Sequence, residues 1–347
     1  MNTNYWVVDK IVDTLENSPQ LKQAAELLEQ NEVVAFPTET VYGLGGNAKS
    51  DLAVEKIFAA KGRPSDNPLI VHIARKEQLN DFVDVIPDSA KKLMAHFWPG
   101  PLTIILSYKE GTLSSKTTAG LSTVGIRMPD HQVALALLEQ VDLPIAAPSA
   151  NRSGKPSPTM AQHVKEDLDG RIAGIVDGGP TGVGVESTVV DCTTEIPVIL
   201  RPGGVTKEQL EDVVGEVLYD PALTDVKETP KSPGMKYRHY APDAPLYLVD
   251  GSKEGIQVLI DGSRREGLKV GVLTTEENQS FYDADYIFTC GKREHLETVA
   301  SSIYEALRSF DKAGMDLIYS EMFPNVGVGN AIMNRLLKAA GQKVIKG

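Results

Sequence analysis

The chain has 347 residues, of which 41% are hydrophobic and 24% charged, and its formal net charge is −12. This length and composition exclude a disordered chain and predict two domains with sizeable cores. The acidic total argues against a protein that coats nucleic acid non-specifically. Residues 61–160 nevertheless hold 11 basic and 9 acidic residues, a balance of +2 that leaves −14 for the rest. This stretch indicates either a small anionic ligand or a limited nucleic-acid contact.

The N-terminal sequence, the lengths of the apolar runs and the two cysteines indicate in which cellular compartment the protein is found. The N-terminus carries no charged-then-apolar signal, and no apolar run is long enough to cross a bilayer. Cys192 and Cys290 are far apart in sequence and belong to no metal-spaced cluster. We therefore expect a soluble, cytoplasmic protein with reduced, structural thiols.

The first predicted elements are a helix over residues 18–30, with Ser18 as its cap, and a strand over 33–36. Residues 37–48 follow, reading PTETVYGLGGNA. The glycines of this stretch would let backbone N–H groups approach a ligand closely, although a plain strand-to-helix turn explains them equally well. The spacing matches neither a Walker loop nor a dinucleotide fingerprint.

Residues 61–73, KGRPSDNPLIVHI, organise the rest of the chain. They follow an amphipathic helix for which Asp51 is the expected N-cap, and a buried strand containing His72 is predicted over 69–73. Lys61 and Arg63 lie between helix and strand, where an ammonium and a guanidinium suit a phosphate-bearing ligand. The alternative is that both cations only complement the C-terminus of the helix.

Further apolar segments are also followed by polar or cationic residues. Strands are predicted over 102–106, 123–128, 144–147, 172–177, 185–190 and 196–200, with helices over 88–97 and 133–141 and others starting at 159 and 206. Arg127 is costly inside an apolar strand unless it meets a buried carboxylate or a ligand carboxylate. Arg201 follows another strand, and the polar loop 148–159 suits phosphate or sugar contacts or is simply a solvated loop. Cations at the ends of strands favour an anionic substrate.

Residues 219–245 read as a linker that contains SPGMKYRHYAP at 232–242. This basic and aromatic cluster predicts either a lid over a site or an ordinary surface tether. From residue 246 strands alternate with helices, the last helix being capped by Asn330, which predicts a second doubly wound domain. We expect this domain to be regulatory or scaffolding.

Taken together, eight segments resemble the YrdC-like family of threonylcarbamoyl-AMP synthases in its long, two-domain form. They read FPTETVYGLGG, KGRPSDNPLIVHI, FWPGPLTIIL, VGIRMPDH, APSANRSGKPSPT, ESTVVD, LRPGG and SPGMKYRHYAP. The resemblance covers essentially the whole chain. It implies an α/β fold with a catalytic domain over residues 1–218, a linker over 219–245 and a smaller Rossmann-like domain over 246–347. The catalytic domain would be a twisted mixed sheet with flanking helices and a concave basic face.

The resemblance also implies a reaction, in which L-threonine, bicarbonate or CO2, and ATP give threonylcarbamoyl-AMP and pyrophosphate. The product feeds threonylcarbamoylation of the adenosine beside the anticodon of certain tRNAs. The implied partners are a downstream tRNA threonylcarbamoyl transferase complex, through a transient contact, and an RNA. Mg2+ is the implied cofactor, held by ATP phosphates and waters rather than by protein side chains.

The resemblance assigns roles residue by residue. Lys61 and Arg63 are the implied catalytic residues, acting by positioning and electrostatic stabilisation. Many family members have a hydroxyl residue where this chain has Ala147, which leaves only a main-chain contact there. The implied threonine-binding residues are Thr40, His72, Arg127, Ala147 and Ser187. The implied ATP-binding residues are Lys61, Arg63, Asn67, Thr123, Ser149, Asn151, Ser157, Arg201, Tyr237, His239 and Tyr240.

Two other functions fit parts of the sequence. One is a module that binds RNA without nucleotide chemistry, against which the acidic total and the lack of an aromatic RNA platform count. The other is a carbamoyl transferase of the hydrogenase-maturation type, whose extra zinc-finger modules need CxxC pairs that this sequence lacks.

Overall fold

The computed structural model describes residues 2–9, 14–223 and 239–347 of the chain. These residues form two compact units, which are described separately. The first unit holds the described residues up to 153, residues 157–182, and those from 186 to 223; the second holds 154–156, 183–185 and 239–347. No helix in the described ranges is both long and apolar enough to span a membrane.

The first unit is built on one mixed sheet of eleven strands in its described part, in the order β1-β8-β2-β3-β7-β4-β6-β5-β9-β10-β11. Strand β4 pairs in parallel with β6 and antiparallel with β7, so residues far apart in sequence meet at the centre of the sheet. The strands are β1 Asn4–Val7, β2 Val34–Phe36, β3 Gly43–Asn47, β4 Val71–His72, β5 Leu102–Ser107, β6 Thr123–Arg127, β7 Ile145–Ala146, β8 Gly174–Asp177, β9 Thr188–Asp191, β10 Val198–Arg201 and β11 Leu218–Tyr219.

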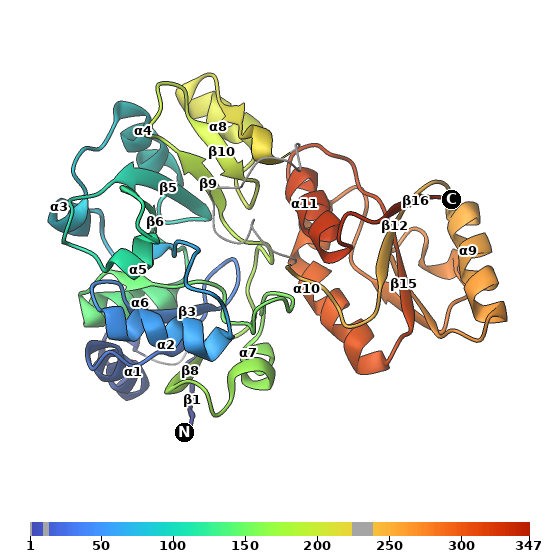
Figure 1. The fold of residues 1–347 in the computed structure, drawn as a ribbon, viewed down its shortest axis with the longest axis horizontal. Coiled ribbons are helices and arrows are strands. Elements are labelled where there is room, and N and C mark those ends of the chain that lie inside the picture. The colour runs from blue at the N-terminus through green and yellow to red at the C-terminus, as the bar shows by residue number, and fades with distance from the viewer. Residues whose placement is uncertain (1, 10–13, 224–238) are drawn as a thin grey trace. The chain divides into compact units, whose positions relative to one another are not determined.

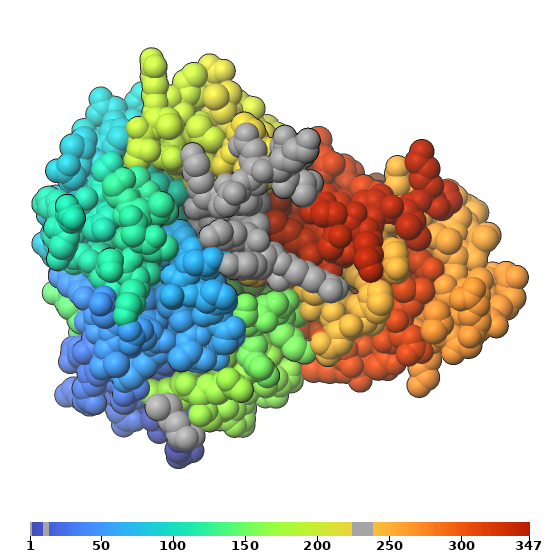
Figure 2. Space-filling view, viewed as in Figure 1, coloured from blue at the N-terminus to red at the C-terminus, as the bar shows by residue number. Residues whose placement is uncertain are grey.

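Helices cover both faces of this sheet (Figure 1). Along β2, Val34 and Phe36 pack in one core with α1 and α6, whereas Ala35 packs in the other with α2 and α4. This alternation is what the period of two residues in a strand dictates. Helices α2 and α5 are neighbours on the face seen in the space-filling view (Figure 2). The helices are α1 Pro19–Glu29, α2 Asp51–Lys61, α3 Leu79–Phe82, α4 Asp88–Phe97, α5 Ser115–Thr118, α6 Gln132–Val141, α7 Ala161–Leu168 and α8 Lys207–Val214.

Two local predictions in the first unit are wrong. The N-cap of α2 is Ser50, whose hydroxyl accepts a hydrogen bond from the Ala53 amide, while the carboxylate of Asp51 accepts one from the Ser114 hydroxyl. The glycines of residues 37–48 form neither a loop nor a strand-to-helix turn, because they lie in the buried strand β3. A Cβ at Gly45 would stand 2.7 Å from the ring of Phe36, so this glycine is required for close packing of β3 against β2.

The second unit is a parallel sheet of five strands in the order β14-β13-β15-β12-β16. Helix α9 covers one face, and α10 and α11 cover the other (Figure 1). The predicted cap of the last helix is wrong, because Asn330 is its second residue and Val328 occupies the N-cap position. The elements are β12 Leu246–Asp250, α9 Lys253–Arg265, β13 Val270–Thr274, β14 Tyr286–Thr289, α10 Leu296–Ala313, β15 Leu317–Glu321, α11 Gly329–Ala339 and β16 Val344–Lys346.

Candidate active site

The residues expected to bind threonine gather around Arg127, the last residue of β6. His72 of β4 is its register partner in the parallel pair, which brings both side chains to one side of the sheet. Arg127 Nη1 donates to Thr40 Oγ1 at 2.7 Å, and Nη2 lies 2.5 Å from Glu39 Oε2. Of the two partners expected for a buried arginine, the protein supplies a carboxylate, Glu39, which sequence reasoning did not assign.

The imidazole of His72 is buried and packs edge-on against Phe36, with ring centroids 6.1 Å apart. Its Nδ1 lies 3.3 Å from the carbonyl oxygen of Ile70, which also accepts the amide of Ala147 at 2.9 Å. Burial, reinforced by the charge of Arg127, lowers the pKa of His72 to about 3, with the Ile70 carbonyl acting in the opposite direction. His72 is therefore neutral near pH 7 and offers a hydrogen bond rather than a charge.

Ser187 lies just before β9 and is tied to two neighbouring strands. Its hydroxyl is 2.7 Å from Thr103 Oγ1 of β5, and Arg201 of β10 donates from Nη2 both to this hydroxyl at 3.1 Å and to the Ser187 carbonyl at 2.9 Å. Two neighbouring residues, Gly100 and Pro101, connect this group to Arg127. The carbonyl oxygen of Gly100 accepts a hydrogen bond from Arg127 Nε at 3.4 Å, and that of Pro101 accepts one from the amide of Thr188, the residue after Ser187, at 3.0 Å. The first unit thus brings Thr40, His72, Arg127, Ala147, Ser187 and Arg201 into one connected group.

Lys61 ends helix α2 and holds the loop that follows β7. Its ammonium donates to the carbonyl oxygens of Ser149 at 2.5 Å and Asn151 at 2.7 Å, and to Asn151 Oδ1 at 3.4 Å. The Ser149 hydroxyl in turn donates to Asn151 Oδ1 at 2.6 Å. These contacts of the Lys61 ammonium fix Ser149 and Asn151, two of the expected ATP-binding residues.

Charges around the ammonium of Lys61 act against each other. The pKa of Lys61 lies well below its ordinary value, mainly because the ammonium is buried and also because the charge of Arg63 repels it. The carboxylates of Asp167 and Glu186 act in the opposite direction and offset part of this shift. Glu186 also accepts a hydrogen bond from the hydroxyl of Ser157 at 2.6 Å. The loop carrying Ser157 is therefore joined to the segment preceding β9 by a buried carboxylate.

Two other expected ATP-binding residues lie on the connection between α2 and β4. Asn67 is buried, and its Nδ2 has no hydrogen-bond partner among the residues that the structure describes. Arg63 is half-buried and lines an open hollow with the end of α2 and with Lys116 of α5. A bound ligand is one group that could accept a hydrogen bond from this buried donor of Asn67.

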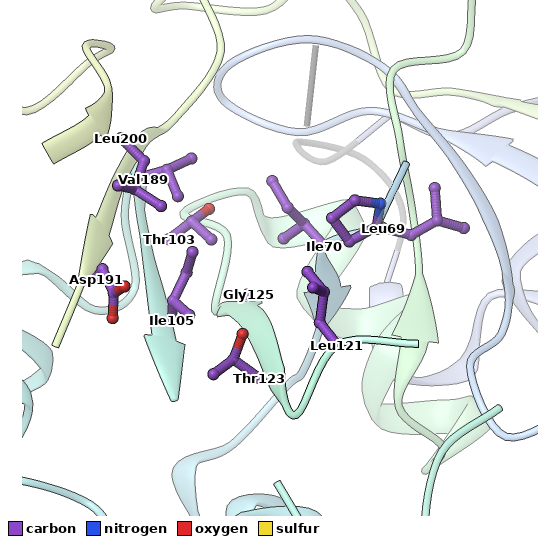
Figure 3. A pocket seen from close by; sticks show the side chains of 11 residues that line it. Leu69, Ile70, Thr103, Ile105, Leu121, Thr123, Gly125, Val189, Asp191 and Leu200 are labelled. Atoms are coloured by element: carbon purple, nitrogen blue, oxygen red, sulfur yellow. The ribbon is translucent and has the colours of Figure 1, made fainter. Parts of the chain in front are cut away.

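An apolar pocket of about 100 Å³ opens on the sheet of the first unit (Figure 3). Its walls come from the chain before β4 and from strands β5, β6, β9 and β10, and Gly125 leaves room between them. Thr123, an expected ATP-binding residue, and Asp191 supply polar atoms. The lining residues are Pro68, Leu69, Ile70, Thr103, Ile105, Leu121, Thr123, Gly125, Val189, Asp191 and Leu200.

The three linker residues expected at ATP belong to another part of the chain than the group around Arg127. Tyr237 lies outside the described residues. His239 and Tyr240 belong to the second unit, where Tyr240 packs on Tyr304 with ring centroids 5.2 Å apart and lies 5.7 Å from the guanidinium of Arg335. Their contact with a nucleotide stays a prediction.

Sequence reasoning missed Glu39, Thr103 and Glu186 as parts of the site. Glu39 stands between two threonines in the PTET motif, a signal that could have been read as a polar cluster. Thr103 lies inside an apolar strand, and nothing in its local sequence indicates that it meets Ser187. In the described ranges no group of three or more His, Cys, Asp or Glu side chains is arranged to hold a metal ion.

Two family models match the chain one after the other. The Sua5_yciO_yrdC model, with the description Telomere recombination, matches residues 26–203, and the model for the C-terminal domain of threonylcarbamoyl-AMP synthase matches residues 205–341. The chain belongs to the Sua5/YrdC family of threonylcarbamoyl-AMP synthases. The family resemblance and the fold class expected from the motifs are thereby confirmed.

Relatives in this family match along nearly the full chain. The threonylcarbamoyl-AMP synthase of Bacillus subtilis is 62% identical over 346 residues, which is 100% of both chains. The Schizosaccharomyces pombe enzyme is 40% identical, covering 94% of this chain and 89% of its own. The crystal structure of P. abyssi Sua5 complexed with L-threonine is similar at a TM-score of 0.92 and 47% identity, covering 99% of this chain and 100% of its own.

Proposed function

We propose that this chain synthesises L-threonylcarbamoyl-AMP from L-threonine, bicarbonate or CO2, and ATP, with release of pyrophosphate. The observation that carries the proposal is the likeness to P. abyssi Sua5 complexed with L-threonine, which extends over 99% of the chain. The connected group around Arg127 supports it, because that group offers a guanidinium, two hydroxyls and a neutral imidazole within one buried region.

Threonine is held, in this proposal, on the side of the sheet where Arg127, His72 and Thr40 meet. Arg127 takes the carboxylate, since a guanidinium pairs with a carboxylate through two parallel hydrogen bonds. Thr40 and Ser187 form hydrogen bonds with the polar groups of the amino acid, and the main chain at Ala147 supplies a further contact to it. Neutral His72 adds a hydrogen bond without adding a second positive charge.

ATP occupies the neighbouring surface. The adenine enters the apolar pocket of Figure 3, where Ile70, Ile105 and Leu200 contact the flat ring and Asp191 accepts a hydrogen bond from its amino group. Thr123 stands at the same pocket. The remaining expected ATP ligands face the ribose and the phosphates and are Lys61, Arg63, Asn67, Ser149, Asn151, Ser157 and Arg201, with Tyr237, His239 and Tyr240 closing over the nucleotide.

The chemistry needs positioning more than a reactive side chain. The neutral amine of threonine attacks CO2 and loses a proton to give a carbamate, whose oxygen attacks the α-phosphorus as pyrophosphate leaves. Lys61 and Arg63 stabilise charge on the phosphates, and Lys61 also holds Ser149 and Asn151 in place. Mg2+, when bound to the ATP phosphates and waters, neutralises further phosphate charge.

The product of this reaction is a mixed anhydride that a second enzyme must use. In this proposal a tRNA threonylcarbamoyl transferase complex receives it by transient contact and modifies the adenosine beside the anticodon. An RNA contact by this chain and a cytoplasmic location belong to the same proposal.

The test is to mix the purified full chain with ATP, Mg2+ and bicarbonate and to measure pyrophosphate release with and without L-threonine. L-serine and L-alanine serve as controls for the side chain. We expect release that depends on L-threonine. A folded protein that binds ATP but releases no pyrophosphate with any amino acid would refute the proposed function.

A further inference from the structure

The ion pair between Glu39 and Arg127 is buried and incompletely hydrogen-bonded. The exposed fractions of the two side chains are 11% and 5%, and Nη2 of Arg127 lies 2.5 Å from Oε2 of Glu39. Neither carboxylate oxygen of Glu39 has a hydrogen-bond partner of good geometry in the part of the chain that the structure describes, and the contact with Arg127 is made through Oε2 rather than Oε1. A buried carboxylate is costly unless hydrogen bonds satisfy its lone pairs, so this carboxylate needs an explanation.

A second buried glutamate in the same protein shows what a satisfied pair contains. Glu321 of the second unit accepts hydrogen bonds on Oε1 from Thr274 at 2.6 Å, Asn278 at 3.0 Å and Tyr282 at 2.9 Å. Its Oε2 pairs with Arg293 at 3.1 Å. Glu321 is saturated by the protein, whereas Glu39 has the same kind of cation on one oxygen and none of the additional donors on the other.

The charges expected at the threonine group are also unbalanced. Among the residues assigned to threonine, Arg127 is a cation, His72 is neutral, and no residue carries the negative charge that an α-ammonium group requires. Glu39 is the residue next to Thr40, and its carboxylate touches Arg127. It therefore places an anion beside the guanidinium that takes the substrate carboxylate.

We propose that Glu39 receives the α-ammonium group of L-threonine on its Oε1 while Arg127 receives the α-carboxylate. This proposal rests on the proposed function. A zwitterionic amino acid carries its two charges on groups attached to one carbon, and the Glu39–Arg127 pair presents the opposite two charges side by side. Glu39 is thus a specificity-determining residue that selects an amino acid over the hydroxy acid of the same shape.

The experiment compares two ligands on two proteins by isothermal titration of the full chain. The ligands are L-threonine and (2S,3R)-2,3-dihydroxybutanoic acid, which replaces the α-ammonium with a hydroxyl and keeps the carboxylate. The variant is E39Q, which keeps the size of the side chain and removes its charge. We expect E39Q to bind L-threonine about 10- to 100-fold more weakly, the range for a lost charged hydrogen bond, with a change of less than about threefold for the hydroxy acid.

Two results would overturn the proposal. Equal loss for both ligands would mean that Glu39 only holds Arg127 in position, and an unchanged affinity for L-threonine would mean that Glu39 contacts no ligand. The E39D variant keeps the charge, and we expect it to retain the preference for L-threonine, which keeps the test open should E39Q fold poorly. E32Q is the matched control: it removes the same charge from Glu32, which lies before β2 and pairs with Lys56 of α2, and it should leave both affinities unchanged. Pyrophosphate release by the unmodified protein tests the proposed function separately, since a failure there is independent of the difference between the variants.

Discussion

Replacing Lys61 with methionine separates the role of its charge from its role in packing. Methionine has a similar length and no charge, so the variant removes the ammonium from its contacts with the carbonyl oxygens of Ser149 and Asn151. Each acceptor left without a donor costs about 1–3 kcal/mol. The buried ammonium itself has a desolvation cost of several kcal/mol that the variant no longer carries. The two effects offset each other, and we expect the free energy of unfolding to change by less than about 3 kcal/mol.

Turnover should fall much further than stability. The variant loses a positive charge beside the expected phosphates and loosens the loop of Ser149 and Asn151. We expect threonine-dependent pyrophosphate release to fall at least about 1000-fold, equivalent to about 4 kcal/mol in the barrier. Lys56→Met is the matched control, because Lys56 lies on the same helix and pairs with Glu32 away from the site. Urea unfolding and pyrophosphate release measured on both variants decide the matter, and a Lys61→Met enzyme within tenfold of wild-type activity would refute the reasoning.

Three further predictions concern the pocket, the imidazole and the second unit. Gly125→Val should raise the KM for ATP at least about tenfold, because even a Cβ at this position would stand 3.2 Å from the Thr103 side chain within the pocket. The effect on L-threonine affinity should be smaller, and equal effects on both substrates would contradict this. His72→Asn should flatten the pH dependence of stability. Below the ordinary pKa of 6.5 the unfolded chain binds a proton at His72, whereas the folded chain, in which the pKa is about 3, does not. Between pH 7 and pH 5 the free energy of unfolding of the wild-type protein, measured in urea, should therefore fall by about 2 kcal/mol more than that of the variant. Parallel wild-type and variant curves would be the contrary result. Glu321→Leu should destabilise the second unit by about 3 kcal/mol or more, because Arg293 and three other hydrogen-bond donors lose their acceptor. Amide hydrogen exchange should become faster in β13 and β15. Unchanged exchange in these strands would count against a stabilising role of the Glu321 carboxylate.

Local sequence signals predict the helices well. Ser18 caps α1 as expected, with its hydroxyl accepting the Leu21 amide, and the predicted stripe on that helix is buried. Such signals depend on residues three or four positions apart, which the sequence displays directly. The nearby choice between Ser50 and Asp51 as a cap goes wrong because the carboxylate of Asp51 finds a distant partner, Ser114.

The site is less predictable because its contacts join distant parts of the chain. The motifs indicate that Lys61, Ser149 and Asn151 belong to the site. Only the folded chain shows that Lys61 donates hydrogen bonds to the loop that contains Ser149 and Asn151, about ninety positions later in the sequence. Glu39 belongs to a polar cluster that the sequence displays, but only the folded chain shows that its carboxylate meets Arg127, 88 positions further on. The glycines of β3 have a composition typical of a ligand loop, and only the packed ring of Phe36 reveals their structural purpose.

The strand order of the first unit has a consequence for how the protein is made on the ribosome. Strand β1 pairs with β8, and the partner of Asn4 is Gly174, which is synthesised 170 residues later. Strand β5 pairs with β9, and the partner of Leu102 is Thr188, 86 residues later. Loops of this length are slow to close, and strand edges exposed in the meantime are prone to pair with other chains. The catalytic sheet can therefore be completed only after about 200 residues have left the exit tunnel, and the nascent chain needs protection from aggregation until then.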